Sequence, residues 1–247
     1  MISLRRFLGR IKRRVRAGRA KPAVRPSLPR LQPQWTYPSG DGELRIAVFK
    51  ELLGLFPAGR MLDLACGHGL FAIAAHEMGW HVTAVDVRTE RMPMTPGVDW
   101  VQHDVRTYQV DGFDVIALLG LLYHLELPDQ LDLLRRCSRT ITILDTHHSN
   151  RPTHLEEGYA GHTYRELPEG QEERLAVTQT AAWGNLTSFW PTQPDLVRML
   201  RDSGFATILA LVPPNTPDRT FYLCLPERNG HDSGHRTPPA PEDAHRS

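Results

Sequence analysis

The sequence predicts an α/β protein built on a doubly wound, mostly parallel sheet with helices on both faces. Three observations predict it. Short apolar runs alternate with stretches of helical spacing, and the run 113–118 is almost wholly apolar, as expected of a strand covered on both faces. A turn with two glycines follows the first run. A chain of 247 residues, 40% of them hydrophobic, is long enough to bury such a core.

The expected elements follow in chain order from apolar spacing and from Gly and Pro boundaries. Pro128 lies in the first turn of the helix 127–137, and Gly79 and Gly204 each stand just after a helix. The expected helices cover 42–55, 70–78, 127–137 and 194–202. The expected strands cover 61–64, 81–85, 98–102, 113–118, 140–144, 206–211 and 220–225.

The first strand and its turn carry the strongest functional signal. Asp63 lies near the end of the strand, where a buried carboxylate is costly unless it meets a cation or a hydrogen-bond donor. Gly67 and Gly69 let the backbone approach a ligand closely. Asp86 ends the next apolar run, about where a ribose-binding acid stands after such a turn. The pattern predicts a site for a nucleoside with a cationic group.

These residues resemble the class I S-adenosylmethionine-dependent methyltransferases over roughly residues 41–225. Asp63-Leu-Ala-Cys-Gly-His-Gly69 stands where that family has an acid followed by a glycine-rich loop, with Ala65 in place of the usual first glycine. Val82-Thr-Ala-Val-Asp86, His103-Asp104-Val105 and the segment 113–124 match the family's following motifs in order. The resemblance implies a Rossmann-like sheet of seven strands that ends in an antiparallel hairpin strand.

The resemblance also implies S-adenosylmethionine as the cofactor and methyl transfer as the activity. Asp63 would hold the cofactor's ammonium group, Asp86 the ribose hydroxyls and Asp104 the adenine amino group. The other residues implied to line the cofactor are Ala65, Gly67, Gly69, Val87, Val105, Leu119 and Gly120. In-line displacement needs mainly alignment of the two reactants, which can remove roughly 7–11 kcal/mol of barrier.

The general base that would remove the acceptor's proton is expected at the carboxyl ends of the fourth and fifth strands. The catalytic candidates are His124, His147 and His148, with Tyr123 and Asp145 beside them. His124 follows an apolar run and is equally well explained as a packed core histidine. Histidines in a polar loop are common on surfaces, so no metal is expected from the histidines at 147, 148, 154 and 162.

The segment 146–191 is longer than an ordinary connection and is predicted to be an insertion that covers the substrate. Its residues, beginning at Asp145-Thr-His-His148, loosely resemble bacterial methyltransferases related to the tRNA wobble-uridine carboxymethyltransferases. RNA is therefore an alternative acceptor. A small molecule is the preferred one, since Arg151, Arg165 and Arg198 suit a carboxylate or phosphate equally well.

The charge of the chain is divided between an arm and a body. Residues 1–40 hold 11 of the 29 Lys and Arg and none of the 28 Asp and Glu, so residues 41–247 are acidic. Residues 4–15 have the spacing of a basic amphipathic helix, which would touch an anionic membrane or nucleic acid or remain a disordered arm. Residues 21–38 are Pro-rich and predict a linker, and 226–247 predict a disordered tail.

The three cysteines have no metal-binding spacing and are odd in number, and no apolar run is long enough to span a membrane, so a cytoplasmic protein is predicted. The segment 1–20 is its candidate for peripheral membrane contact. Two functions other than methyl transfer are alternatives. Gly67-His-Gly-Leu-Phe-Ala72 also fits a dinucleotide motif, but Asp63 would repel a pyrophosphate over this turn. A non-catalytic adaptor that keeps the pocket is the other. We expect methyl transfer to an oxygen or nitrogen atom; the oligomeric state stays open.

Overall fold

The computed structural model describes residues 41–151, 153–171, 182–213 and 219–227. The arm and linker expected over 1–40, and the tail expected over 226–247 apart from its first two residues, lie outside these ranges and stay predictions. In the ranges that are described, no helix is both long enough and apolar enough to cross a membrane.

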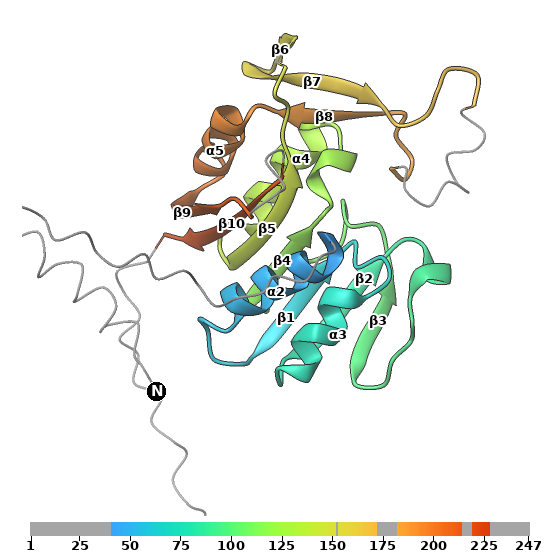
Figure 1. Cartoon of the computed structure of the whole chain (residues 1–247), viewed down its shortest axis with the longest axis vertical. Coiled ribbons are helices and arrows are strands. Elements are labelled where there is room, and N and C mark those ends of the chain that lie inside the picture. Colours follow the sequence, from blue (N-terminus) through green and yellow to red (C-terminus); the bar gives the residue numbers. More distant parts are fainter. Residues whose placement is uncertain (1–40, 152, 172–181, 214–218, 228–247) are drawn as a thin grey trace, which may run out of the picture. The chain divides into compact units, whose positions relative to one another are not determined.

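The main sheet has the expected doubly wound form (Figure 1). Among the described residues, seven strands lie in the order β3-β2-β1-β4-β5-β10-β9. The first five run parallel, and β10 runs antiparallel to both of its neighbours. The strands are β1 (Arg60–Leu64), β2 (His81–Asp86), β3 (Val98–Gln102), β4 (Val115–Leu119), β5 (Ile141–His147), β9 (Phe205–Leu211) and β10 (Arg219–Pro226).

The strand order reverses between β1 and β4, and this reversal positions the site. β2 and β3 extend the sheet to one side of β1, while β4 and β5 extend it to the other. The loops that leave β1 and β4 therefore turn in opposite directions and open a crevice at the carboxyl edge.

Helices cover both faces of this sheet, so each face has its own core. α2 (Asp41–Leu53) and α3 (Leu70–Glu77) pack on one face, and α4 (Leu127–Cys137) and α5 (Gln193–Asp202) pack on the other (Figure 1). Successive residues of a strand point to opposite faces. Accordingly, Met61 joins the core under α2 and α3, whereas Leu62 joins the core under α4 and α5, and both side chains are fully buried.

The fifth strand runs three residues beyond its expected end. It was predicted to stop at Leu144, because Asp145-Thr-His147 is polar, but β5 continues to His147. These residues pair with β10, with Thr146 opposite Thr220 and His147 opposite Arg219. The prediction was wrong here because the polar side chains are satisfied by partners from β10, which lies far away in the sequence.

The insertion after β5 contains a regular sheet of its own rather than only a loop. β6 (His154–Glu156), β7 (Tyr159–Arg165) and β8 (Thr187–Pro191) pair antiparallel. β8 joins it to the main domain, since the Phe189 amide donates to the Leu125 carbonyl at 3.0 Å and the Phe189 ring is buried in the core under α4 and α5. Trp190 adds a second bond, from Nε1 to the Tyr123 carbonyl at 2.9 Å. The insertion is therefore attached directly to the loop after β4.

Gly161 sits where β7 passes closest to β8, and this contact is testable. A Cβ at this position would lie 2.6 Å from the Trp190 carbonyl oxygen and would clash with the Phe189 ring. Overpacking of this kind costs about 1–3 kcal/mol. We expect Gly161→Ala to lower the free energy of unfolding by that amount, measured by urea denaturation.

Gly42→Ala is the matched control. Gly42 lies in the first turn of α2 and nothing is within 4 Å of its ideal Cβ, so this variant should be neutral or more stable by up to about 1 kcal/mol. Equal losses in the two variants would contradict the close approach of β7 to β8.

Candidate functional site

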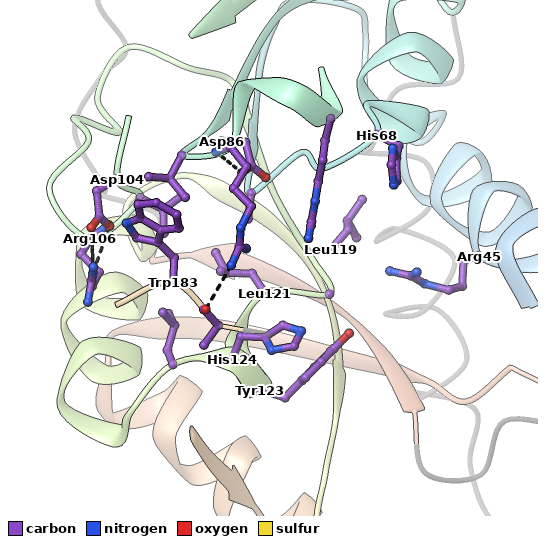
Figure 2. A pocket seen from close by; sticks show the side chains of 18 residues that line it. Arg45, His68, Asp86, Asp104, Arg106, Leu119, Leu121, Tyr123, His124 and Trp183 are labelled. Carbon is purple, nitrogen blue, oxygen red and sulfur yellow. Dashed lines mark hydrogen bonds and ion pairs between the residues drawn. The ribbon is translucent and has the colours of Figure 1, made fainter. Parts of the chain in front are cut away.

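A cavity of about 510 Å³ lies at the crevice where the strand order reverses (Figure 2). Eight residues that the sequence predicted for the site line it: Ala65, Asp86, Val87, Asp104, Val105, Leu119, Gly120 and His124. The other lining residues are Arg45, His68, Arg88, Arg91, Arg106, Leu121, Tyr123, Leu125, Ala182 and Trp183. Asp63, Gly67, Gly69, His147 and His148 do not line it.

Asp63 lies behind the turn that borders the cavity. It is in the middle of the sheet, between β2 and β4, and only 1% exposed. Burial first, and the neighbouring Asp86 second, raise the pKa of Asp63 to about 7, although a hydrogen bond from the Ala72 amide opposes the shift. Within the described residues its Oδ2 atom is buried and has no hydrogen-bond partner. A cationic group at the turn would supply the missing interaction.

The turn after β1 has three residues in the left-handed region, Ala65 at φ 60°, Gly67 at φ 53° and Gly69 at φ 68°. For Ala65 this conformation costs roughly 1–2 kcal/mol, which the glycine that is usual at this position would avoid. Nothing is within 4 Å of an ideal Cβ on Gly67, so its surroundings are open. A Cβ on Gly69 would instead collide with the Trp100 ring. The structure thus gives Gly69 a packing reason, and only Gly67 stands beside free space.

Asp86 ties the turn to the end of β2. Its Oδ2 atom accepts from the Gly67 amide at 2.9 Å, and its Oδ1 atom accepts from the Arg88 amide at 2.9 Å. A carboxylate has about four acceptor sites, so each oxygen can still accept a bond from a ligand. Asp86 therefore positions the glycine turn and presents acceptors to the cavity at the same time.

Asp104 is already paired, which the sequence did not reveal. Arg106 Nε lies 3.0 and 3.1 Å from its two carboxylate oxygens, and the Arg106 amide donates to Oδ1 at 3.0 Å. The hydrogen bond from Arg106 lowers the pKa of Asp104. Since both oxygens face a guanidinium, Asp104 is held ionised with less acceptor capacity left for a ligand.

Two of the described histidines line the cavity, His68 and His124, and Glu166 holds the second of them. His124 Nδ1 lies 3.3 Å from Glu166 Oε2, and the same carboxylate oxygen accepts from the Ala182 amide at 2.8 Å. Burial would raise the pKa of Glu166, but hydrogen bonds from His124, Ser188 and Ala182 outweigh it and lower that pKa. The ionised Glu166 therefore orients the ring through Nδ1 and leaves Nε2 as the nitrogen that Glu166 does not engage.

His147 and His148 occupy a different position from the one predicted. His147 is the last residue of β5, stacks on Trp190 with 5.1 Å between ring centroids, and has Nε2 2.7 Å from Arg219 Nη2. His148 is buried, with Nε2 3.4 Å from the Thr220 hydroxyl. Because both rings contact protein beside the cavity, this geometry does not support them as bases. No three His, Cys, Asp or Glu among the described residues are grouped to hold a metal ion.

Asp145 is fully buried next to the cavity and is bracketed by two arginines. Arg219 Nη1 lies 2.8 and 2.9 Å from its carboxylate oxygens, and Arg45 Nε donates to Oδ2 at 2.6 Å. Arg219 Nη2 also reaches the Tyr123 hydroxyl at 3.3 Å. This triad fixes α2, β5 and β10 together at the cavity wall. No local pattern predicts this triad, since Arg45 and Asp145 are 100 residues apart in the chain.

Comparison with known proteins gives one matching family model and one shared fold. Residues 61–142 match a family model described as "Methyltransferase domain". The chain is 28% identical over 147 residues to the ubiquinone biosynthesis O-methyltransferase of Xanthomonas campestris pv. campestris. This alignment covers 51% of this chain and 61% of that protein. The chain thus spans about three fifths of the length of the curated relatives it matches.

Solved structures share the fold at lower identity. The N-terminal domain of EvdMO1, crystallised in the presence of SAH and D-fucose, has a TM-score of 0.58 at 22% identity and covers 73% of this chain and 79% of its own. The 1,6-didemethyltoxoflavin-N1-methyltransferase of Burkholderia thailandensis has a TM-score of 0.51 at 20% identity, with 74% of this chain and 77% of its own covered. Both structures carry the same Rossmann-like arrangement.

The buried triad predicts a large stability effect. Asp145→Asn would leave Arg219, whose side chain is 10% exposed, without its counter-charge. Breaking such a pair costs about 3–5 kcal/mol, and we expect that loss in the free energy of unfolding. Asp132→Asn is the control. The Asp132 side chain is 60% exposed, and its surface pair with Arg136 is worth at most about 1 kcal/mol. Similar losses in both variants would contradict the triad.

The raised pKa of Asp63 predicts a pH-dependent gain in stability on its replacement. Between the ordinary value of 3.8 and about 7, the folded chain keeps a proton on Asp63 that the unfolded chain releases, so stability falls as pH rises through this range. Asp63→Asn removes the dependence. Relative to the parent chain, thermal unfolding should show a benefit that grows by on the order of 2–3 kcal/mol from pH 5 to pH 8.

The exposed Asp99 on β3 provides the control for this pH series. Asp99→Asn should shift the unfolding midpoint equally, and little, at both pH values. A benefit of Asp63→Asn that stays constant with pH would show that the carboxyl is ionised throughout.

Proposed function

We propose that the chain is a class I S-adenosylmethionine-dependent methyltransferase, whose cavity binds S-adenosylmethionine and which transfers the methyl group to an oxygen or nitrogen atom of a small-molecule acceptor. When bound, this cofactor supplies a methyl group on a positively charged sulfur. The chain's own residues then have three tasks: to hold the cofactor, to align the acceptor and to accept a proton.

The residues around the cavity fit this cofactor. The single observation that carries the proposal is the bond from the Gly67 amide to Asp86, because it sets an acceptor-rich carboxylate beside a glycine with open surroundings. Asp86 would hold the ribose hydroxyls, and Val87 and Val105 would contact the adenine. Asp63 suits the ammonium group, since its buried Oδ2 atom needs a donor. A cation there would also return the Asp63 pKa toward its ordinary value.

Asp104 keeps a smaller role in this proposal. Its carboxylate is bound to Arg106, so the Asp104–Arg106 pair would border the adenine as a unit. Leu119 and Gly120, at the end of β4, would flank the reacting sulfur. A Cβ on Gly120 would lie 3.1 Å from Arg45 Nη2, so glycine keeps room for the arginine of the triad.

His124 is the base in the proposed reaction, and Glu166 is its positioning residue. Glu166 engages Nδ1, so Nε2 is the atom that would take a proton from the acceptor's hydroxyl or amine. A base positioned in this way contributes roughly 10²–10⁴-fold to the rate. The Tyr123 ring, 4.4 Å from that of His124, closes the same wall.

The names of the relatives support a small-molecule acceptor. The curated relative is named as an O-methyltransferase that acts in ubiquinone biosynthesis, and one structural neighbour as an N-methyltransferase bound to didemethyltoxoflavin. For this chain the acceptor atom is therefore proposed to be oxygen or nitrogen.

Calorimetry with the full chain tests the cofactor. We expect micromolar binding of S-adenosylmethionine and S-adenosylhomocysteine and no binding of NAD(H). Asp86→Ala removes the acceptors for two hydroxyls, and at about 1.5 kcal/mol each this should weaken binding on the order of 100-fold. Asp99→Ala, on the exposed side of β3, should bind as the parent chain does. Binding of NAD(H), or an Asp86→Ala variant with full affinity, would overturn the proposal.

A further inference from the structure

Two arginines from the segment after β2 line the cavity at its insertion side. Arg88 follows directly on Asp86-Val87, and Arg91 ends the short helix η1 (Thr89–Arg91). Arg88 is only 6% exposed, its guanidinium lies 5.2 Å from the centre of the Trp183 ring, and its Nη2 atom donates to the Ala182 carbonyl at 3.2 Å. Figure 2 shows Trp183 and Asp86 at this part of the cavity.

Two nitrogen atoms of the Arg91 guanidinium are shielded from solvent and lack hydrogen-bond acceptors among the described residues. Its Nε and Nη2 atoms are buried and have no hydrogen-bond partner within the described part of the chain. Burial first, and the charge of Arg91 second, lower the pKa of Arg88, so the two side chains repel each other across the cavity wall. An unpaired buried guanidinium costs several kcal/mol, which a bound anion would offset.

Among the residues that the structure describes, the acids near this pair are engaged elsewhere or exposed. Asp86 accepts from two backbone amides, Asp104 is bound by Arg106, and Glu166 is bound by His124 and the Ala182 amide. Glu90 lies on the outside of η1 and is exposed. The described lining residues therefore include four arginines against two aspartates, an excess of positive charge.

The proposed cofactor does not supply the missing anion. Its carboxylate is accompanied by an ammonium and a sulfonium, so the molecule as a whole is cationic, and its amino-acid end is assigned to Asp63 and Gly67. The net positive charge of the cofactor would raise, rather than lower, the electrostatic energy of the two arginines. The compensating charge has to come with the other reactant.

A chain of contacts links the arginine pair to the proposed base. Arg88 donates to the Ala182 carbonyl, the Ala182 amide donates to Glu166, and Glu166 holds His124. One small molecule in this cavity can therefore meet the arginines at one end and His124 at the other.

We infer that Arg88 and Arg91 form an anion-binding subsite, and that the methyl acceptor carries a carboxylate or phosphate group that binds there while its hydroxyl or amine faces His124. The inference rests on the proposed function for the identity of the second reactant, but the subsite itself rests on the arginine pair. Guanidinium groups bind both kinds of anion in a bidentate manner, so both are included.

The test uses the full chain saturated with S-adenosylhomocysteine and titrated with inorganic phosphate, phenyl phosphate and benzoate. Phenyl phosphate carries a phosphate group and benzoate a carboxylate, each on a small aromatic molecule. At least one of the two should bind as tightly as inorganic phosphate or more tightly. Arg91→Met should weaken anion binding about 10-fold or more, as expected for loss of charged hydrogen bonds. Arg91→Lys keeps the charge but loses the bidentate fork, so it should bind the anions more weakly than the parent chain and more tightly than Arg91→Met.

Arg139→Met provides the matched control, since Arg139 is exposed at the far end of α4. It should leave all three affinities unchanged.

The outcomes separate this inference from the proposed function. If S-adenosylhomocysteine binds but the anions bind equally well to Arg91→Met, the subsite is wrong and the function stands. If S-adenosylhomocysteine does not bind while anion binding depends on Arg91, the proposed function is wrong and the subsite stands. Preference for inorganic phosphate over both aromatic anions would show a site for free ions and would overturn the assignment to the acceptor.

Discussion

The hydrogen bond between the Gly67 amide and the Asp86 carboxylate is the interaction on which the site depends. It joins the turn after β1 to the end of β2, two neighbouring strands of the parallel sheet. The turn is held in left-handed conformations at Ala65 and Gly67, which is unfavourable for the alanine, and the bond helps to hold it there. Without this restraint the cavity would lose both its glycine border and its best-placed acceptor.

Four carboxylates near the carboxyl edge of the sheet are satisfied in four ways, and this division gives each a separate role. Asp145 is neutralised by two arginines, Asp104 by one, and Asp86 by backbone amides. Asp63 has the weakest compensation, and its pKa rises to about 7 as a result. The first two are structural or border groups. The last two retain the capacity to bind a ligand, which is why they suit the hydroxyls and the cation of a nucleoside.

The insertion contributes to the site through side chains that bind back to the main domain. Glu166 follows β7 and reaches His124, which lies in the loop after β4. Ala182 and Trp183 lie in the connection between β7 and β8 and contact Arg88, from the end of β2. The insertion therefore orients the proposed base and contacts one of the two arginines. The position of the His124 ring therefore depends on a segment more than forty residues away in the chain.

Local pattern was enough to determine the order of the strands and helices, the glycine turn and the two acids at the ends of β1 and β2. Apolar periodicity and left-handed glycine positions are properties of short stretches, and the family resemblance rested on them.

Only the tertiary structure decided the rest, because it depends on contacts between distant residues. It extended β5 through Asp145 to His147 by pairing with β10, turned the expected loop into a sheet, and moved His147 and His148 out of the cavity. It also brought Arg45 to Asp145, gave Gly69 a packing reason in Trp100, and set Arg88 against Trp183 of the insertion. A charge's partner is fixed by the folded distance between side chains, which no spacing along the chain encodes.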